Sequence, residues 1–254
     1  MKSYIKKTAV TFAAAAILAS AMPFPEVAPT AYAADATSTG GNGARSCASI
    51  SEFATKTSAR LTDREERYTA KSTDRLNRKN EREQKQNDRL ADARTKHDER
   101  RLEKYSKLDE KATTDAQKAA VAAYKTAIDA AKATRRAAVD AAMNTFRNAL
   151  QAAIANRKAK VDAALTTFKT SVTAALDKAK ADCAAGVDMK TVRNTLKASL
   201  EAARTKLQTD RKAIEKLGDV VPPLAKTRNA AVEQATKTFK AAAEAARTAL
   251  KAAF

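Results

Sequence analysis

The feature that most restricts the fold of this chain is an 11-residue spacing of large apolar residues between residues 139 and 187. Eleven residues make three helical turns at about 3.67 residues per turn, so residues with this spacing stay on one face of a long, nearly straight helix. The faces are narrow and flanked by alanine. This favours a coiled-coil-like seam over the wide, bulky face of a helix that lies on a lipid surface. Two rows carry the spacing: Val139, Leu150, Val161, Val172 and Cys183, and Met143, Ile154, Leu165, Leu176 and Val187.

The composition predicts helix in the rest of the chain as well. The 254 residues include five Gly, five Pro and no Trp, and three of the prolines fall within residues 1–33. Ala, Lys and Arg are strong helix formers, whereas Pro interrupts helices most severely. Large apolar residues are too sparse for a broad core. We therefore expect an all-α protein held together by narrow helix–helix contacts.

The first 33 residues have the pattern of a secretory signal peptide. Three lysines precede an apolar stretch at 9–22, and Ala31-Tyr32-Ala33 then offers a small-x-small cleavage site. The apolar stretch is shorter than the about 20 residues that span a membrane. Residues 34–46 are rich in Gly, Ser and Thr, which is typical of a flexible linker. We expect an exported protein of the extracellular space, the cell surface or the periplasm.

A long helical hairpin is predicted from one internal helix-start signal. Thr114 followed by Gln117 fits a capping box, and Asp115 suits the positive end of a helix. The chain is therefore expected to reverse there, between a charged helix over residues 48–112 and a second helix that ends near residue 185.

The two cysteines fit the same reversal. If the chain turns near residue 115, residues whose numbers sum to 230 lie level on the two arms, and Cys47 and Cys183 satisfy this sum. In an exported chain the pair predicts an intrachain disulfide, with an interchain bond or two free thiols as the alternatives. Within one residue, the same register pairs Ala54 with Leu176, Leu61 with Phe168, Leu76 with Ile154, Leu90 with Val139, and Leu102 with Ile128.

The remaining residues predict a shorter C-terminal helical hairpin. A helix is expected over residues 189–217 and another over 224–254, with residues 218–223 as the turn because they contain Gly218 and a Pro-Pro pair. The expected organisation is thus a disulfide-closed hairpin over 47–186 followed by a second hairpin over 187–254. Whether the second hairpin extends the first or folds back along it is left open.

No pattern of catalytic, metal-binding or cofactor-binding residues is recognisable in the sequence. The one histidine, His97, lies among charged residues of the first helix. Acidic residues alternate with basic ones at helical spacing, where ion pairing is the expected role. There is no glycine-rich phosphate loop and no Cys/His cluster with metal spacing. We expect a non-enzymatic protein without a cofactor or metal.

The positive charge is the main indication of a partner. The formal net charge is +19, and +17 remains without residues 1–33, which hold three Lys and one Glu. The net charge is +4 on the first predicted helix, +6 on the second and +7 across the two C-terminal helices, so the charge is spread along the chain. Such a surface attracts anionic envelope polymers and permits non-specific nucleic-acid binding, although aromatic residues are too few for a single-strand stacking platform. The locally dense candidates for polyanion contact are Arg135, Arg136, Arg157, Lys158 and Lys160.

These features lead to one main functional hypothesis and two alternatives. The main hypothesis is a structural or interaction protein of the cell envelope, a helical rod that contacts anionic polymers or other proteins through basic faces. The basic charge and long arms resemble periplasmic holdase chaperones of the Skp type, but the β-rich body of those proteins is not visible here. A holdase-like chaperone and a lipid-surface-binding protein are the alternatives, and homo-oligomer formation is left open.

Overall fold

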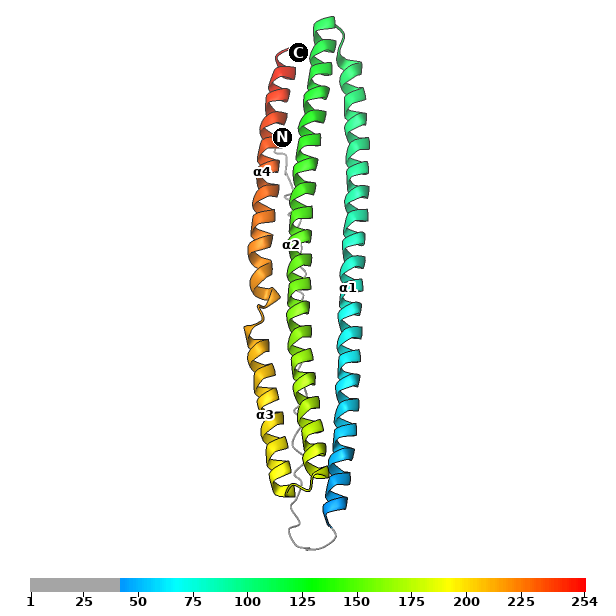
Figure 1. The fold of residues 1–254 in the computed structure, drawn as a ribbon. Coiled ribbons are helices and arrows are strands. Elements are labelled where there is room, and N and C mark those ends of the chain that lie inside the picture. Colours follow the sequence, from blue (N-terminus) through cyan, green and yellow to red (C-terminus); the bar gives the residue numbers. More distant parts are fainter. Residues whose placement is uncertain (1–41) are drawn as a thin grey trace, which may run out of the picture.

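The computed structural model describes residues 42–254, and all regular elements in that range are α-helices (Figure 1). The helices are α1 (Asn42–Lys111), α2 (Asp115–Ala184), α3 (Met189–Ala213) and α4 (Leu217–Lys251). The all-α class and the long antiparallel hairpin of α1 and α2 are confirmed. The predicted signal peptide and the first part of the expected linker lie outside the described residues. The last five residues of that linker are helical, because extending an anchored helix costs less than starting one.

The chain reverses where the start signal predicts. The backbone N–H of Gln117 donates to Thr114 Oγ1 at 3.2 Å, and the backbone N–H of Thr114 donates to Gln117 Oε1, also at 3.2 Å. These reciprocal bonds form the capping box and satisfy donors that the first helical turn would otherwise leave unpaired. The interval between α1 and α2 is therefore only three residues long.

The opposite end of the hairpin is closed by the predicted disulfide. Cys47 and Cys183 are bonded, with their Cα atoms 5.8 Å apart. Just beyond, Gly186 adopts a positive φ of 76°, and the backbone N–H of Val187 donates to Asp182 O at 3.0 Å. This is a Schellman ending, in which glycine accepts the left-handed conformation without strain. The side chain of Asp188 then caps α3 by accepting from the backbone N–H of Thr191 at 3.0 Å.

The two C-terminal helices fold back along the hairpin. Figure 1 shows α3 and α4 following one another along α2, and each packs on α2 rather than on the other. The expected turn at 218–223 is wrong, because these residues belong to α4. The chain bends instead at 214–216, where the side chain of Ile214 is buried and Arg157 Nη1 donates to Glu215 O at 2.6 Å.

Two prolines are tolerated inside α4 because they lie close to its start. Pro222 and Pro223 cannot donate to the carbonyl groups of Gly218 and Asp219, four residues earlier. Both of those residues are exposed, so water can donate hydrogen bonds to their carbonyl oxygens. Placing the bend before the prolines lets the apolar stripe of α4 continue along α2.

Apolar contacts gather at the two ends of the rod. At the disulfide end, Ala54 of α1 shares a cluster with Leu176 of α2, and Leu61 and Phe168 pack against the same cluster. The register expected from the sequence is confirmed for these pairs. At the turn end, a second cluster joins all three arms. Its buried members are Tyr105, Ile128, Ala243 and Ala246.

Between these ends the expected apolar seam on α1 is wrong. Leu76, Leu90 and Leu102 are 44%, 37% and 59% exposed. From residue 69 to residue 104, no apolar side chain of α1 is buried or half-buried. Toward the turn, α2 presents Lys132, Arg136 and Asp140 to α1, so polar pairs replace the seam there. The middle of α1 is therefore attached to α2 mainly by charged groups.

Candidate functional site

The five basic residues predicted for polyanion contact do not form one surface. Arg135 is exposed, and its guanidinium carbon lies 5.6 Å from the ring centroid of Phe239 on α4. Its neighbour Arg136 is half-buried against α1, where Nη2 donates to Asp98 Oδ1 at 2.9 Å. Burial lowers the pKa of Arg136, and the nearby Arg94 and Arg101 lower it further. Arg135 and Arg136 thus lie at different helix–helix contacts.

The second predicted group is divided in the same way. Arg157 is half-buried and holds the bend between α3 and α4. Lys158 is exposed and pairs with Asp162 at 2.6 Å, which raises the pKa of Lys158 through the hydrogen bond. Lys160 is exposed beside a shallow hollow that Asp210 and Ile214 also line. Polyanion contact by these residues stays a prediction.

The contact between α1 and α2 near the turn uses charges of both signs. Asp98 of α1 accepts from Arg136 and also pairs with Lys132, and Arg94 forms a two-point pair with Asp140 at 2.6 and 3.0 Å. Such planar two-point pairs are the stronger kind of charged hydrogen bond. These charges hold the hairpin together, so they are poorly placed to bind a partner.

The surface of α1 carries a continuous row of cations, here called the basic ridge. From residue 60 to residue 111, positions on one face of the helix recur in steps of 4, 7, 4 and 3 residues, a period of 18 residues or about five turns. Twelve positions fall on this face, and eleven are Lys or Arg, the exception being Ala93. None of the 14 acidic residues of α1 falls there. The ridge consists of Arg60, Arg64, Lys71, Arg75, Arg78, Arg82, Arg89, Lys96, Arg100, Lys107 and Lys111.

The ridge is a long and accessible surface. Ten of its residues are exposed, and Arg64 is half-buried. At about 1.5 Å per residue the ridge extends for roughly 75 Å along an uninterrupted helix. Within the described part of the chain, eight of its cations form no ion pair. These are Arg60, Arg64, Arg75, Arg82, Arg89, Lys96, Arg100 and Lys111.

Helix stability alone does not explain this arrangement. The ridge contains five like-charged pairs four residues apart, such as Arg60 with Arg64 and Lys96 with Arg100. Each such pair destabilises a helix by roughly 0.2–0.5 kcal/mol, whereas opposite charges at the same spacing stabilise it. The structure records few opposite-charge pairs on the ridge, among them Arg78 with Asp74 at 2.5 Å and Lys107 with Glu103 at 3.3 Å. A row of repelling cations is stabilised by a bound anion.

Sequence reasoning missed the ridge because it counted charge along the chain. The net charge of the first helix is small, since its acidic residues occupy other faces of the helix. The signal that reveals the ridge is the 18-residue period, which is visible when the residues are projected at 3.6 per turn. That projection is justified once α1 is known to be one unbroken helix.

Comparison with known proteins adds no further assignment, because no protein-family model, no curated protein and no solved structure matches this chain. Among residues 42–254, the His, Cys, Asp and Glu side chains form no group that could hold a metal ion. None of the helices in that range has the length and apolarity needed to cross a bilayer. His97 is exposed on α1.

Proposed function

We propose that this protein is an exported, non-enzymatic helical rod that binds anionic polymers through the basic ridge of α1. The single observation that carries the proposal is the ridge, a row of eleven cations, ten of them exposed, without an interposed acidic residue. Cations in such a row release the condensed counterions of a polymer when they bind it, which makes binding favourable and strongly dependent on salt. The Arg-rich composition suits phosphate and sulfate groups, which guanidinium groups bind at two points.

Export is the part of the proposal that explains the disulfide. A bond between residues separated by 136 positions persists in oxidising compartments and is rare in the cytosol. The predicted signal peptide at residues 1–33 agrees with that compartment. The partners would then be the anionic polymers of the envelope or of the extracellular space.

The structure favours this function over the two alternatives. A holdase or a lipid-surface protein needs a contiguous apolar surface. The large apolar side chains that are exposed in the described residues stand singly along the rod or at its ends: Leu76, Leu90, Leu102, Val187 and Phe254.

Replacing ridge cations tests whether the ridge itself, rather than the total charge of the protein, binds the polymer. The variant Arg82→Gln/Arg89→Gln/Lys96→Gln removes three ridge charges. The matched control Lys118→Gln/Lys178→Gln/Lys180→Gln removes three exposed charges from α2, outside the ridge. Binding to a sulfated polysaccharide and to long-chain polyphosphate is measured over a range of salt concentrations. The slope of log K against log salt should fall by about 2 in the ridge variant, because each lost contact removes about 0.7.

The control variant shows whether a reduced slope of log K against log salt reflects the ridge or the total charge. We expect its slope to stay close to that of the unmodified protein. Equal losses in both variants would show that total charge, rather than the ridge, attracts the polymer. No binding of either polymer at low salt would overturn the proposed function itself.

A further inference from the structure

Most acidic residues of α1 are sorted into a row of their own beside the basic ridge. From residue 63 to residue 110, a second set of positions recurs with the same 18-residue period as the ridge. Of its twelve positions, eight are Asp or Glu, Arg67 and Lys85 are basic, and Ala70 and Ser106 are uncharged. The eight carboxylates, here called the acidic row, are Asp63, Asp74, Glu81, Asp88, Asp92, Glu99, Glu103 and Glu110.

The acidic row borders the ridge on one side only. At about 100° per residue, the row lies roughly 80° around the helix from the middle of the ridge, which is about 7 Å on a helix 10–12 Å in diameter. All eight of its residues are exposed. The flank on the other side of the ridge carries no acidic residue, since it consists of Leu61, Tyr68, Lys79, Gln86, His97 and Lys104.

Near the turn, both rows lie on the side of α1 that faces away from α2. Asp98, Arg101 and Tyr105 of α1 bond to residues of α2. Arg100 of the ridge and Glu103 of the acidic row therefore lie on the far side of the helix, and both are exposed. The acidic row, rather than another helix, borders a polymer bound to this part of the ridge.

Ion pairing within α1 accounts for only part of the acidic row. Two of its carboxylates pair with ridge cations, at 2.5 and 3.3 Å. Within the described part of the chain, the side chains of Glu81, Asp92 and Glu99 form no ion pair and no hydrogen bond. These three are therefore uncompensated negative charges beside the ridge.

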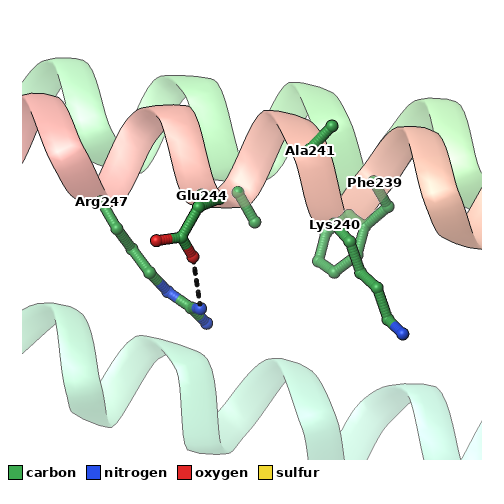
Figure 2. Close-up of a pocket in the computed structure, with 6 residues that line it drawn as sticks. Phe239, Lys240, Ala241, Glu244 and Arg247 are labelled. Atoms are coloured by element: carbon green, nitrogen blue, oxygen red, sulfur yellow. Dashed lines mark ion pairs between the residues drawn. The ribbon is translucent and has the colours of Figure 1, made fainter.

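The charges of α4 are arranged differently. Figure 2 shows Glu244 between Lys240 and Arg247 along one face of the helix, and Glu244 Oε2 pairs with Arg247 Nη1 at 3.6 Å. Opposite charges at this spacing attract one another and stabilise a helix. On α4 acids and bases are interspersed on one face, whereas on α1 they form two parallel rows of opposite sign.

A row of carboxylates beside the ridge limits the width of a polyanion that can bind. The separation of about 7 Å is within the Debye length of about 8 Å at physiological salt, so repulsion by the acidic row is not screened out. A single extended chain can keep its anionic groups on the ridge alone. A duplex nucleic acid has two winding backbones, so a straight row meets a backbone only about every 17 Å on average, half of one turn. The phosphates between these points lie beside the ridge, where the carboxylates repel them.

We propose that the acidic row makes the basic ridge selective for a single extended anionic chain, such as polyphosphate or an unbranched wall polymer, over a duplex nucleic acid. The chain lies lengthwise on the ridge. Glu81, Asp92 and Glu99 determine specificity, because they repel the charges of a wider ligand that extend past the ridge. The inference rests on the proposed function and adds to it the class of polymer.

The test removes the three uncompensated carboxylates and compares a narrow ligand with a wide one. The acidic-row variant is Glu81→Gln/Asp92→Asn/Glu99→Gln. It should keep the helical content of the unmodified protein, measured by circular dichroism, because none of the three side chains holds a contact. The ligands are long-chain polyphosphate and blunt-ended duplex DNA, each titrated into the oxidised protein at several salt concentrations.

A matched control makes the same charge change elsewhere. Asp177→Asn/Glu201→Gln/Glu244→Gln removes three exposed carboxylates from α2, α3 and α4. The unmodified protein should bind polyphosphate more tightly than the duplex at equal phosphate concentration. The acidic-row variant should bind the duplex about tenfold more tightly and polyphosphate at most about twofold more tightly, because only the duplex reaches the carboxylates. The control should change binding of either ligand by no more than about twofold.

The outcomes separate the acidic row from the ridge. Unchanged duplex binding by the acidic-row variant would overturn the selectivity and leave the ridge in place. Equal tightening for both ligands, or equal tightening by the control, would show that only total charge matters and would also overturn it. The same holds if the unmodified protein binds the duplex as tightly as polyphosphate. If the unmodified protein binds neither ligand at low salt, the proposed function itself fails.

Discussion

Tyr105 connects the three arms at the turn end of the rod. Its side chain is 7% exposed, and its hydroxyl donates to Asp129 Oδ1 on α2 at 3.1 Å. Its ring belongs to the cluster shared with α4, at 6.3 Å from the ring of Tyr124 between centroids. Burial raises the pKa of Tyr105, and the hydrogen bond to Asp129 raises it further. The fold therefore favours the neutral phenol.

The substitution Tyr105→Phe keeps the ring and removes the hydrogen bond. We expect the free energy of unfolding at neutral pH to fall by roughly 0.5–1.5 kcal/mol, the typical value for one hydrogen bond. Because the folded pKa is raised, the stabilisation is complete below the ordinary tyrosine value near 10 and is lost as pH rises through the raised value. Urea unfolding at several pH values should show the two proteins converging above pH ~10. A difference that stays constant into the alkaline range would contradict this assignment.

Asp98 organises the polar contact between α1 and α2. It pairs with Arg101 on its own helix at 2.7 Å and with Lys132 and Arg136 on α2. One carboxylate thus balances three cations at a place where the side chains are partly buried. Without it these cations would repel one another in a region of reduced solvent screening.

At the scale of elements, α1 differs from α4 in how it is attached to α2. The α4 helix packs on α2 through Ala235, Ala243 and Ala246, all of which are buried. From residue 69 to residue 104, α1 has no such apolar contact, and toward the turn it is attached by the charged pairs around Asp98. This explains why α1 can expose a full basic face. Because α1 is attached only at its ends and through the ion pairs around Asp98, its other faces can carry exposed charged residues.

The variant Asp98→Asn tests this attachment. We expect it to lower the free energy of unfolding by about 1–3 kcal/mol, because a partly buried group of cations loses its shared acceptor. Hydrogen exchange should accelerate at residues 94–104 before it changes in α4. The exposed Asp92→Asn, which makes the same charge change on the same helix, is the matched control and should have little effect. Equal acceleration in both variants would argue against a specific role for Asp98.

At the scale of the whole molecule, the disulfide and the turn fix the two ends of a rod whose middle is held weakly. The bond closes a loop with a sequence separation of 136 residues. In the chain-entropy model such a loop contributes roughly 5 kcal/mol by restricting the unfolded chain. It also keeps α1 in register with α2.

Removing the bond with Cys47→Ala/Cys183→Ala should lower the free energy of unfolding by up to about 5 kcal/mol. Helical content should change little at low denaturant, because the helices keep their local propensity. Hydrogen exchange should then rise first at the N-terminal end of α1. Urea unfolding of the oxidised protein, the reduced protein and the variant measures the effect. Coincident curves for all three would show that the bond does not hold the arms together.

Much of the architecture could be predicted from local sequence signals. The capping box at Thr114 depends on residues within a few positions of one another, and it is confirmed. The Gly186 ending and the Asp188 cap, which the structure shows, are equally local. The level pairing of Cys47 with Cys183 follows from the same turn, because two straight helices of equal rise keep their register over their whole length. The helical hairpin and its closure were therefore determined by the sequence alone.

Tertiary structure decided where the third arm lies and which surface is open. The bend moved from the prolines to residues 214–216, because burial of Ile214 on α2 and the contact from Arg157 outweigh local turn propensity. The apolar register failed at Leu102, because Tyr105 and charged pairs occupy the contact with α2 instead. The residues of the basic ridge are evident in the sequence, but their exposure depends on how the helices pack. Packing energies between distant segments, rather than local propensities, determine that arrangement.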